Sequence, residues 1–473
     1  MEKISVFEIF KIGIGPSSSH SMGPWNAAKD FLHLLEQKNK ELNNIKSIDI
    51  ELFGSLAKTG KGHGTDKAIM MGLMGYDIEI FKTELLEKNI KSIVLEKKIS
   101  LLNKIKVSFD PDQNIHFNFI KKDLKHANTM NFKVHFNNGE KFKSTYFSIG
   151  GGFIKREGVH NKKSRKAEIP FPIQKAEEIL KWCTEENKSL SEISLANELC
   201  WRDHNDIITS LDNIWKVMIE SIYLGCISEG ELPGGLNVKR RASQISQGLL
   251  NGNHSSIDEW IDLIKKQNQD MENVTNWISC FALAVNEVNA SYGRIVTAPT
   301  NGAAGVIPAV LMYFFCFKSN NEKKLIRDFL LVAGEIGMLF KKGATISAAA
   351  GGCQAEIGVS SAMAAGALAS VSGANTRQVL MAAEIAMEHH LGLSCDPIGG
   401  LVQIPCIERN TMGAMKAITA AQLALKSDPN DAIVSLDDVI KTMWETGKDM
   451  MSKYKETSEG GLAIQVSVNQ PEC

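Results

Sequence analysis

The fold is decided by two glycine-rich stretches that carry three cysteines: Gly351-Gly352-Cys353-Gln354-Ala355-Glu356 and Ser394-Cys395-Asp396-Pro397-Ile398-Gly399-Gly400-Leu401-Val402-Gln403-Ile404-Pro405-Cys406. Proline and glycine prevent a continuous helix in the second stretch, so its backbone can turn both thiols toward one point. Three thiolates without a fourth nearby indicate a metal centre with an open coordination position, as a Lewis-acid catalyst requires. Buried structural cysteines are the alternative, because free cysteine packs well as a small apolar residue.

Length and composition limit the class of protein. The chain of 473 residues is long enough for two or three domains. With 44% apolar and 23% charged residues it has the composition of a soluble globular protein, and a formal net charge of -1 gives no indication of nucleic-acid binding. Nine cysteines, an odd number in a long chain, do not indicate a disulfide framework, and the first residues lack the apolar core of a signal peptide. We therefore expect a cytoplasmic protein.

Neither of two uncharged runs predicts a membrane span. Residues 344–374 consist mainly of Ala, Gly and Ser and include Glu356, a composition that favours a helix buried among other helices. The apolar run over 305–317 is too short to cross a bilayer. We expect no contact with a membrane.

Hydroxyl groups are concentrated near the start of the chain, in the stretch Ser17-Ser18-Ser19-His20-Ser21-Met22-Gly23-Pro24. A helical pattern follows over 25–37, so these residues precede a helix N-terminus, where N–H groups and hydroxyls can hold a carboxylate or phosphate. A single capping serine in a polar loop is the alternative. Four hydroxyls and an imidazole exceed what capping requires, which makes Ser17, Ser19 and His20 candidate binding residues.

A glycine-rich loop, Thr59-Gly60-Lys61-Gly62-His63-Gly64-Thr65-Asp66, follows a strand predicted over 47–53 and precedes a helix predicted over 67–74. The flanking glycines are expected to leave His63 little covered and its backbone free to adopt unusual dihedral angles. Loops carry many functional residues, so a catalytic or binding role is predicted for His63. An exposed histidine without a role is the alternative.

Alternating patterns predict two hairpins: one joins 105–109 to 115–119, and the other joins 132–136 to 142–149 through Asn137-Asn138-Gly139. His126, in the loop between them, is a candidate site residue by its position alone. Beyond Pro170 the apolar period becomes helical, with no convincing strand. The predicted helices span 173–185, 189–201, 205–227, 240–251, 256–267, 272–290, 303–317, 324–342, 347–371, 375–391, 409–424 and 435–450.

These patterns predict an α+β fold with an antiparallel α+β domain over 1–153, a linker over 154–169, a large all-α domain over 170–455 and a tail over 456–473. The all-α domain is expected to surround the helix that bears Cys353. Within it, Ala298-Pro299-Thr300-Asn301-Gly302 is either an anion-binding turn or a plain Asn-Gly turn capped by Thr300. The terminal Cys473 is either a frayed end or a fourth thiolate for the site.

Taken together, five stretches resemble the bacterial iron–sulfur-dependent L-serine dehydratases in their single-chain form. They are the serine stretch, Gly62-His63-Gly64-Thr65-Asp66, Ala298 to Gly305, and the two cysteine stretches quoted first. The resemblance covers essentially the whole chain, in the family's order. It implies a [4Fe–4S] cluster with Cys353, Cys395 and Cys406 as ligands, and Cys473 matches the cysteine at which single-chain members end.

The resemblance further implies that the protein converts L-serine to pyruvate and ammonia, as a homodimer, in amino-acid catabolism and gluconeogenesis. The N-terminal domain is similar to a serine-binding regulatory domain of some phosphoglycerate dehydrogenases. Serine must lose an α-proton that is not acidic, and an imidazole in a movable loop suits that task, so His63 is the expected base. The remaining candidates are expected to orient the substrate at a site between the domains: Ser17, Ser19, His20, His126, Thr300 and Asn301.

Four alternatives remain open at this point. A related class of enzyme eliminates sulfide from L-cysteine, although the serine-rich loop favours serine. Zinc bound by two cysteines and one histidine would replace the cluster. A non-enzymatic sensor of serine or oxygen would bind without turnover. A pyridoxal-phosphate dehydratase would require a Schiff-base lysine in a supporting motif, which the sequence does not show.

Overall fold

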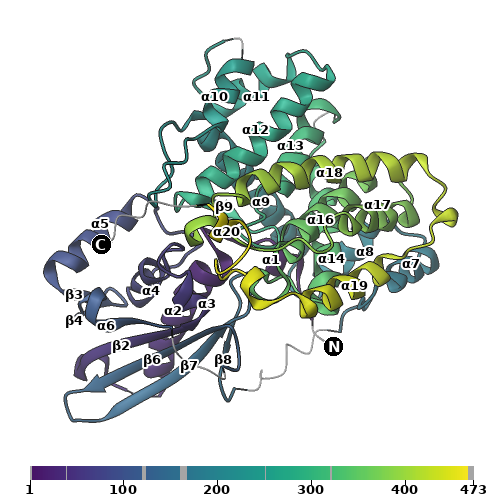
Figure 1. The fold of residues 1–473 in the computed structure, drawn as a ribbon. Helices are drawn as coiled ribbons and strands as arrows, with labels where there is room; N and C mark the ends of the chain where they lie inside the picture. The colour runs from purple at the N-terminus through teal and green to yellow at the C-terminus, as the bar shows by residue number, and fades with distance from the viewer. Residues whose placement is uncertain are drawn as a thin grey trace.

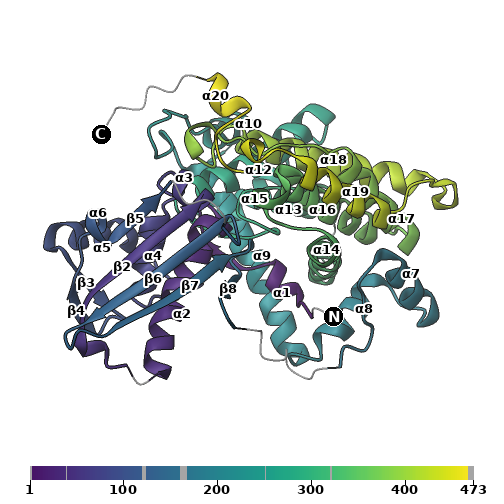
Figure 2. The same ribbon diagram turned by 60° about the horizontal axis from the view of Figure 1, so that its bottom comes forward.

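The computed structural model describes residues 3–38, 40–119, 124–159, 168–250, 252–319 and 322–466. A unit that combines a sheet with helices, formed mainly by residues 12–156, lies beside a larger helical unit (Figure 1, Figure 2). The predicted α+β fold class is confirmed. Residues near the N-terminus pack on the helical unit, and residues 154–156 form a strand of the sheet.

The first unit is built on a five-stranded sheet with the strand order β5-β2-β6-β7-β8. Alternate residues of its central strand, Met130, Phe132 and Val134, are fully buried on one face, as period-two alternation requires. β8 lies within the stretch predicted to be a linker, but it pairs antiparallel with β7 and forms one edge of the sheet. The strands are β2 (Ile45–Gly54), β5 (Ile115–Asn118), β6 (Asn128–Phe136), β7 (Lys141–Ser148) and β8 (Ile154–Arg156).

One of the two predicted hairpins is confirmed and the other is wrong. β6 and β7 pair antiparallel across the Asn-Asn-Gly turn, as expected. In contrast, β4 (Ile105–Ser108) pairs with β3 (Lys98–Leu101), and β5 runs parallel to β2, so the sheet is mixed rather than antiparallel. The short helix α6 (Pro111–Asn114), capped by Asp110, redirects the chain between them. Alternation identifies a strand but does not identify its partner.

The apolar face of this sheet is covered by α2 (Gly23–Gln37), which packs directly on β6, β7 and β8. α4 (Thr65–Leu73) packs on α2, and α5 (Leu85–Glu96) packs on α4 and β3. Phe31 of α2 stacks on Phe132 of β6 with ring centroids 5.2 Å apart. The opposite face is polar and carries the pair His135 and Asp49 at 3.4 Å. The apolar face of the sheet therefore packs on α2, and the serine stretch lies at the N-terminal end of this helix.

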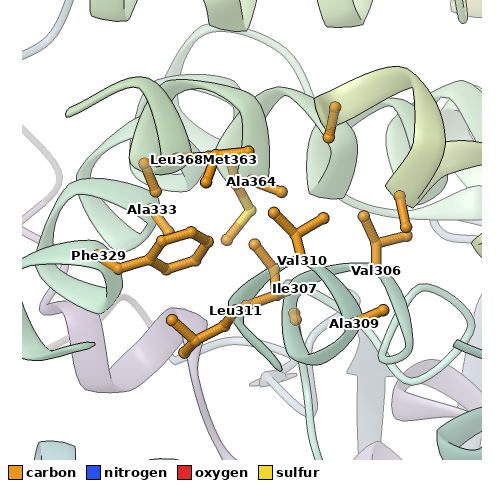
Figure 3. Close-up of a cluster of buried hydrophobic side chains, with 14 of the residues drawn as sticks. Val306, Ile307, Ala309, Val310, Leu311, Phe329, Ala333, Met363, Ala364 and Leu368 are labelled. Carbon is orange, nitrogen blue, oxygen red and sulfur yellow. The ribbon is translucent and has the colours of Figure 1, made fainter. Parts of the chain in front are cut away.

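The helical unit surrounds α16 (Ile357–Val371), whose residues 357–369 are all buried. Its alanines and glycines let α13, α14, α17 and α18 approach closely, as predicted, and Figure 3 shows Met363, Ala364 and Leu368 against side chains of α13 and α14. The other helices are α7 (Ala176–Glu185), α8 (Leu190–Glu198), α9 (His204–Ile227), α10 (Ala242–Leu249), α11 (Ile257–Lys265), α12 (Met271–Ala290), α13 (Val306–Phe317), α14 (Lys323–Gly343), α17 (Thr376–Glu388), α18 (Cys406–Lys426) and α19 (Leu436–Asp449).

The long helix predicted over 347–371 is broken immediately before Cys353. Gly352 has φ +76°, a backbone conformation that glycine adopts without a steric cost. It separates α15 (Ala348–Gly351) from a short 3-10 turn, Cys353–Ala355, which precedes α16. Cys353 therefore lies at the N-terminal end of the central helix and not within it.

The first residues of the chain pack on the helical unit. α1 (Val6–Ile9) contributes buried side chains to the helical core, and Ser5 and Val6 hold the buried carboxylate of Glu198, each at 2.7 Å. β1 (Ile12–Ile14) pairs antiparallel with β9 (Arg294–Val296), a strand that the sequence did not predict. The two units are thus joined by backbone pairing close to the serine stretch. No helix in the described ranges is long and apolar enough to cross a membrane.

Candidate active site

The serine stretch forms a compact buried turn in front of α2. Residues Ser18–Met22 adopt a single π-helical turn, and the Ser17 hydroxyl accepts a hydrogen bond from the His20 N–H at 3.2 Å. The Ser17 and Ser19 hydroxyl oxygens lie 3.2 Å apart, and Ser19 Oγ lies 2.8 Å from His20 Nδ1. One serine does cap the turn, while the others form a polar network around the imidazole.

His20 is completely buried and has hydrogen-bond partners at both ring nitrogens. Its Nε2 lies 3.0 Å from the Ser55 hydroxyl and 3.1 Å from the Thr59 hydroxyl, and its Nδ1 faces Ser19. Burial, and then the neighbouring His63, hold the pKa of His20 well below its usual value. A neutral ring in this network suits orientation more than proton transfer.

His63 is also completely buried, which contradicts the expectation of a little-covered loop histidine. The loop folds back so that His63 Nδ1 lies 2.8 Å from the Thr59 carbonyl oxygen, which requires the proton on Nδ1. Nε2 therefore carries the lone pair, and it has no hydrogen-bond partner among the described residues. Burial lowers the pKa of His63 to about 4, and its ring centroid lies 4.6 Å from that of His20.

The three cysteines meet at one end of α16. Cys353, Cys395 and Cys406 are free thiols and all are buried, Cys406 as the first residue of α18. The guanidinium of Arg409 donates to Cys353 Sγ at 3.3 Å and to the Ser394 carbonyl at 2.7 Å, and it pairs with Asp396 at 2.9 Å. The arginine thereby ties one cysteine to the loop that carries the next.

Electrostatics distinguish the three thiols. A hydrogen bond with Cys395 and the charge of Arg409 lower the pKa of Cys353 to about 7, despite its burial. The same hydrogen bond and burial raise the pKa of Cys395, and burial raises that of Cys406. Within the described part of the chain, no three His, Cys, Asp or Glu side chains are arranged as a metal site.

The Thr300-Asn301 turn lies against the same end of α16. Both residues are buried, and Asn301 Nδ2 donates to Asn289 Oδ1 at 3.0 Å. A Cβ on the adjacent Gly302 would lie 2.6 Å from an oxygen of Glu356, so the turn fits closely against that carboxyl. Burial, and then the charge of Cys353, raise the pKa of Glu356 to about 8. The turn thus adjoins the thiols through Glu356.

His126 is the one predicted site residue in the described ranges that is not shown to join the others. Its Nδ1 accepts a hydrogen bond from the Asn128 N–H at 3.0 Å, and its ring lies 6.0 Å from that of Phe147. These contacts belong to β6 and β7. Cys473 lies outside the described residues, so its role stays a prediction.

The loops of the two units touch directly. A Cβ on Gly62 would lie 2.9 Å from the Gly400 carbonyl oxygen, and the Gly400 position faces the Thr59 side chain. Because Gly62 precedes His63 and Gly400 lies in the loop between Cys395 and Cys406, this contact places the loop of His63 against the loop of the cysteines.

Sequence reasoning missed the role of the segment that was expected to be a tail. Cys395 N–H donates to the Tyr454 carbonyl at 2.7 Å, and Glu456 N–H donates to the Cys395 carbonyl at 2.9 Å. The segment then crosses to the first unit, where Lys58 and Glu459 pair at 2.7 Å, and leads to α20 (Leu462–Gln465), coloured yellow in Figure 1. Neither periodicity nor a motif marks Glu456, and only the two glycines at 460 and 461 indicate a turn.

The fold and site together define a class of protein in which an α+β domain presents buried imidazoles and hydroxyls to thiols held by a helical domain. Comparison with known families identifies that class. Residues 5–159 match the family model described as serine dehydratase beta chain, and residues 174–463 match serine dehydratase alpha chain. The chain belongs to the serine dehydratase family, in the form that joins both parts in one polypeptide.

Similar proteins share this arrangement over their whole length. A protein of Haemophilus influenzae named L-serine dehydratase is 45% identical, with 98% of this chain and 100% of that protein covered. One of Streptomyces coelicolor with the same name is also 45% identical, covering 98% and 99%. L-serine dehydratase 2 of Escherichia coli is 44% identical, with the same coverage.

Proposed function

We propose that this protein is an L-serine dehydratase that eliminates water from L-serine to yield pyruvate and ammonia, at the site between its two units. Family membership supports the reaction class. The observation that supports this location of the site is the Nε2 of His63, which has no partner among the described residues and lies in a buried loop that touches the cysteine loop at Gly400. An unprotonated imidazole nitrogen without a partner is what a general base requires.

The residues of this chain would divide the reaction among them. Hydroxyls of Ser17 and Ser19 bind the substrate carboxylate, and His20, held by Ser55 and Thr59, orients Ser19. His63 Nε2 accepts the α-proton while the β-hydroxide departs, which leaves aminoacrylate. This enamine tautomerises to an imine, and water hydrolyses the imine to pyruvate and ammonia. Burial of both imidazoles excludes water from the proton-transfer step.

By the chemistry of its donors, the thiol end suits a [4Fe–4S] cluster. Cys353, Cys395 and Cys406 are buried, Cys353 is hydrogen-bonded to Cys395 and its charge acts on Cys406, and thiolates are the usual ligands of such clusters. These three residues would hold it, with Arg409 beside Cys353. When bound, a cluster with one iron free of protein thiolate would act as a Lewis acid toward the hydroxyl that leaves.

An anaerobic purification tests the cofactor and the reaction together. We expect a brown protein with about four irons per chain, by the cluster stoichiometry. It should form pyruvate from L-serine until air bleaches its absorption. A colourless, air-stable and active protein would contradict the cluster, and a brown protein that binds L-serine without turnover would contradict the enzyme.

Cys473 is proposed as the fourth thiolate of the resting site. The described segment up to residue 466 supports this proposal, because the Leu462 N–H donates to Asp396 of the cysteine loop at 2.8 Å. We expect a lag in pyruvate formation at low L-serine that disappears in Cys473→Ser. Identical progress curves for the two proteins would contradict the proposal.

The family resemblance also supports a cytoplasmic homodimer. Light scattering during size-exclusion chromatography of the anaerobic protein measures its mass. We expect about twice the chain mass of 52.0 kDa. A mass equal to one chain would contradict the dimer and leave the proposed reaction untouched.

A further inference from the structure

Glu456 is a buried acidic residue that the reaction scheme above does not use. Its side chain lies between the units, with Oε1 3.5 Å from both Ser19 Oγ and His20 Nδ1. Only 5% of the residue is exposed to solvent, and Oε2 has no hydrogen-bond partner in the described structure. One carboxylate oxygen therefore points to the serine network, and the other is left without a partner.

The backbone holds this carboxylate in place at a steric cost. Glu456 has φ +57°, a left-handed conformation that residues other than glycine rarely adopt. Its N–H donates to the Cys395 carbonyl at 2.9 Å, and its own carbonyl accepts from the Ser55 hydroxyl at 2.8 Å. Contacts from both units thus maintain an unfavourable backbone, as is common at ligand-binding positions.

Buried carboxylates normally have a cation beside them, because an isolated buried charge is costly. In the described ranges, the one salt-bridge partner of Glu456 is His20, whose ring is occupied by Ser19, Ser55 and Thr59. Burial, and then the acidic groups Glu356 and Cys353, raise the pKa of Glu456 well above its usual value, so its negative charge is disfavoured unless a cation lies beside it. The surroundings therefore favour a positive group, which the described residues do not supply there.

We propose that Glu456 binds the α-ammonium group of the substrate, an assignment that rests on the proposed dehydration of L-serine. Serine carries one cationic group, one carbon away from its carboxylate. Hydroxyls of the serine stretch suit the carboxylate, and the free oxygen of Glu456 beside them suits the ammonium. The site then selects α-amino acids over hydroxy acids, and the C-terminal segment serves to complete the substrate pocket.

The test compares Glu456→Gln with the matched control Glu459→Gln. Glutamine keeps the shape of the side chain and removes its charge, and Glu459 lies on the same segment in an exposed pair with Lys58. Loss of one charge-assisted hydrogen bond should raise KM for L-serine about 10- to 100-fold, with a much smaller change in kcat. The control should keep KM within about twofold, as expected for an exposed ion pair. A KM for Glu456→Gln within that same range overturns the proposal.

Binding of two non-reactive probes to the iron-loaded protein gives a second readout. L-Alanine has both the ammonium and the carboxylate, whereas propionate has the carboxylate alone. The unaltered protein should bind L-alanine more tightly, and Glu456→Gln should lose most of that preference, even if it has no turnover. An unchanged preference overturns the proposal.

Two further outcomes remain decisive. Should Glu456→Gln not fold, Glu456→Asp keeps the charge but withdraws it by one methylene. A KM for Glu456→Asp equal to that of the unaltered protein then overturns the proposal, and a raised KM with retained L-alanine preference supports it. Failure of the unaltered protein to turn over L-serine would instead refute the proposed function, so the two failures are distinguishable.

Discussion

The two sides of the site are built differently. The imidazole side, His20 and His63 with their hydroxyl partners, comes from one unit and from residues close in sequence, and most of its polar atoms are paired with one another. The thiol side takes Cys353, Cys395 and Cys406 from separate parts of the helical unit, with the guanidinium of Arg409 beside Cys353. On the imidazole side one ring nitrogen, His63 Nε2, has no partner in the described structure, whereas the thiol side supplies the donors of the proposed cluster.

This difference predicts that substitutions on the two sides have different effects on cofactor content and on activity. Damage to the thiol side should remove both cofactor and activity, while damage to the imidazole side should leave the cofactor in place. Four experiments test this comparison, in order of decreasing effect.

Cys395→Ala should abolish both the cluster absorption and pyruvate formation, because the donor set loses one of its three buried thiols. Iron analysis, visible absorption and a pyruvate assay measure the outcome. Cys200→Ala is the control, since that cysteine is half-buried and outside the site, and it should change neither property. A Cys395→Ala protein with full absorption would show that Cys395 is not a ligand.

His63→Ala should keep the absorption and lower kcat about 10²- to 10⁴-fold, the usual contribution of a general base. Steady-state kinetics on protein matched for iron content measure it. His116→Ala, an exposed histidine on the sheet, should remain fully active. Full activity of His63→Ala would mean that another group takes the α-proton.

Gly62→Ala should weaken the contact between the two sides, because the new Cβ would lie 2.9 Å from the Gly400 carbonyl oxygen. Displacing the base by a fraction of an ångström should lower kcat/KM about tenfold while iron content stays unchanged. Gly248→Ala, where a Cβ meets no atom within 4 Å, is the control. Unchanged kinetics in Gly62→Ala would show that the contact between the two loops does not affect the reaction.

The smallest of the four effects is expected from acid, which should destabilise the folded protein through His63. The folded protein holds the pKa of His63 at about 4, below its usual 6.5, so the unfolded chain binds a proton first as pH falls. The contribution of His63 to the free energy of unfolding should therefore drop by roughly 1 kcal/mol between pH 6.5 and 5.5. Urea unfolding of the unaltered protein and His63→Gln at both pH values measures it. An equal pH dependence of the free energy of unfolding in both proteins would contradict the low pKa of His63 in the folded protein.

Local patterns were sufficient for most of the fold. Helices of the second unit follow the apolar period because residues three and four apart share a face. The same reasoning placed β6 and β7 but paired β4 with β5, since the pairing of strands is decided by tertiary contacts. Cys353 was placed inside a helix because only the three-dimensional packing reveals the break at Gly352.

Within the site, sequence determined which residue types were available, and the motifs located the serine stretch, the His63 loop and the cysteine stretches. Tertiary structure decided their environment. It buried His63, placed His126 against Phe147 of β7, and placed Glu456 beside Ser19 across 437 positions of sequence. Burial and long-range contact depend on which surfaces meet, and no local pattern encodes them.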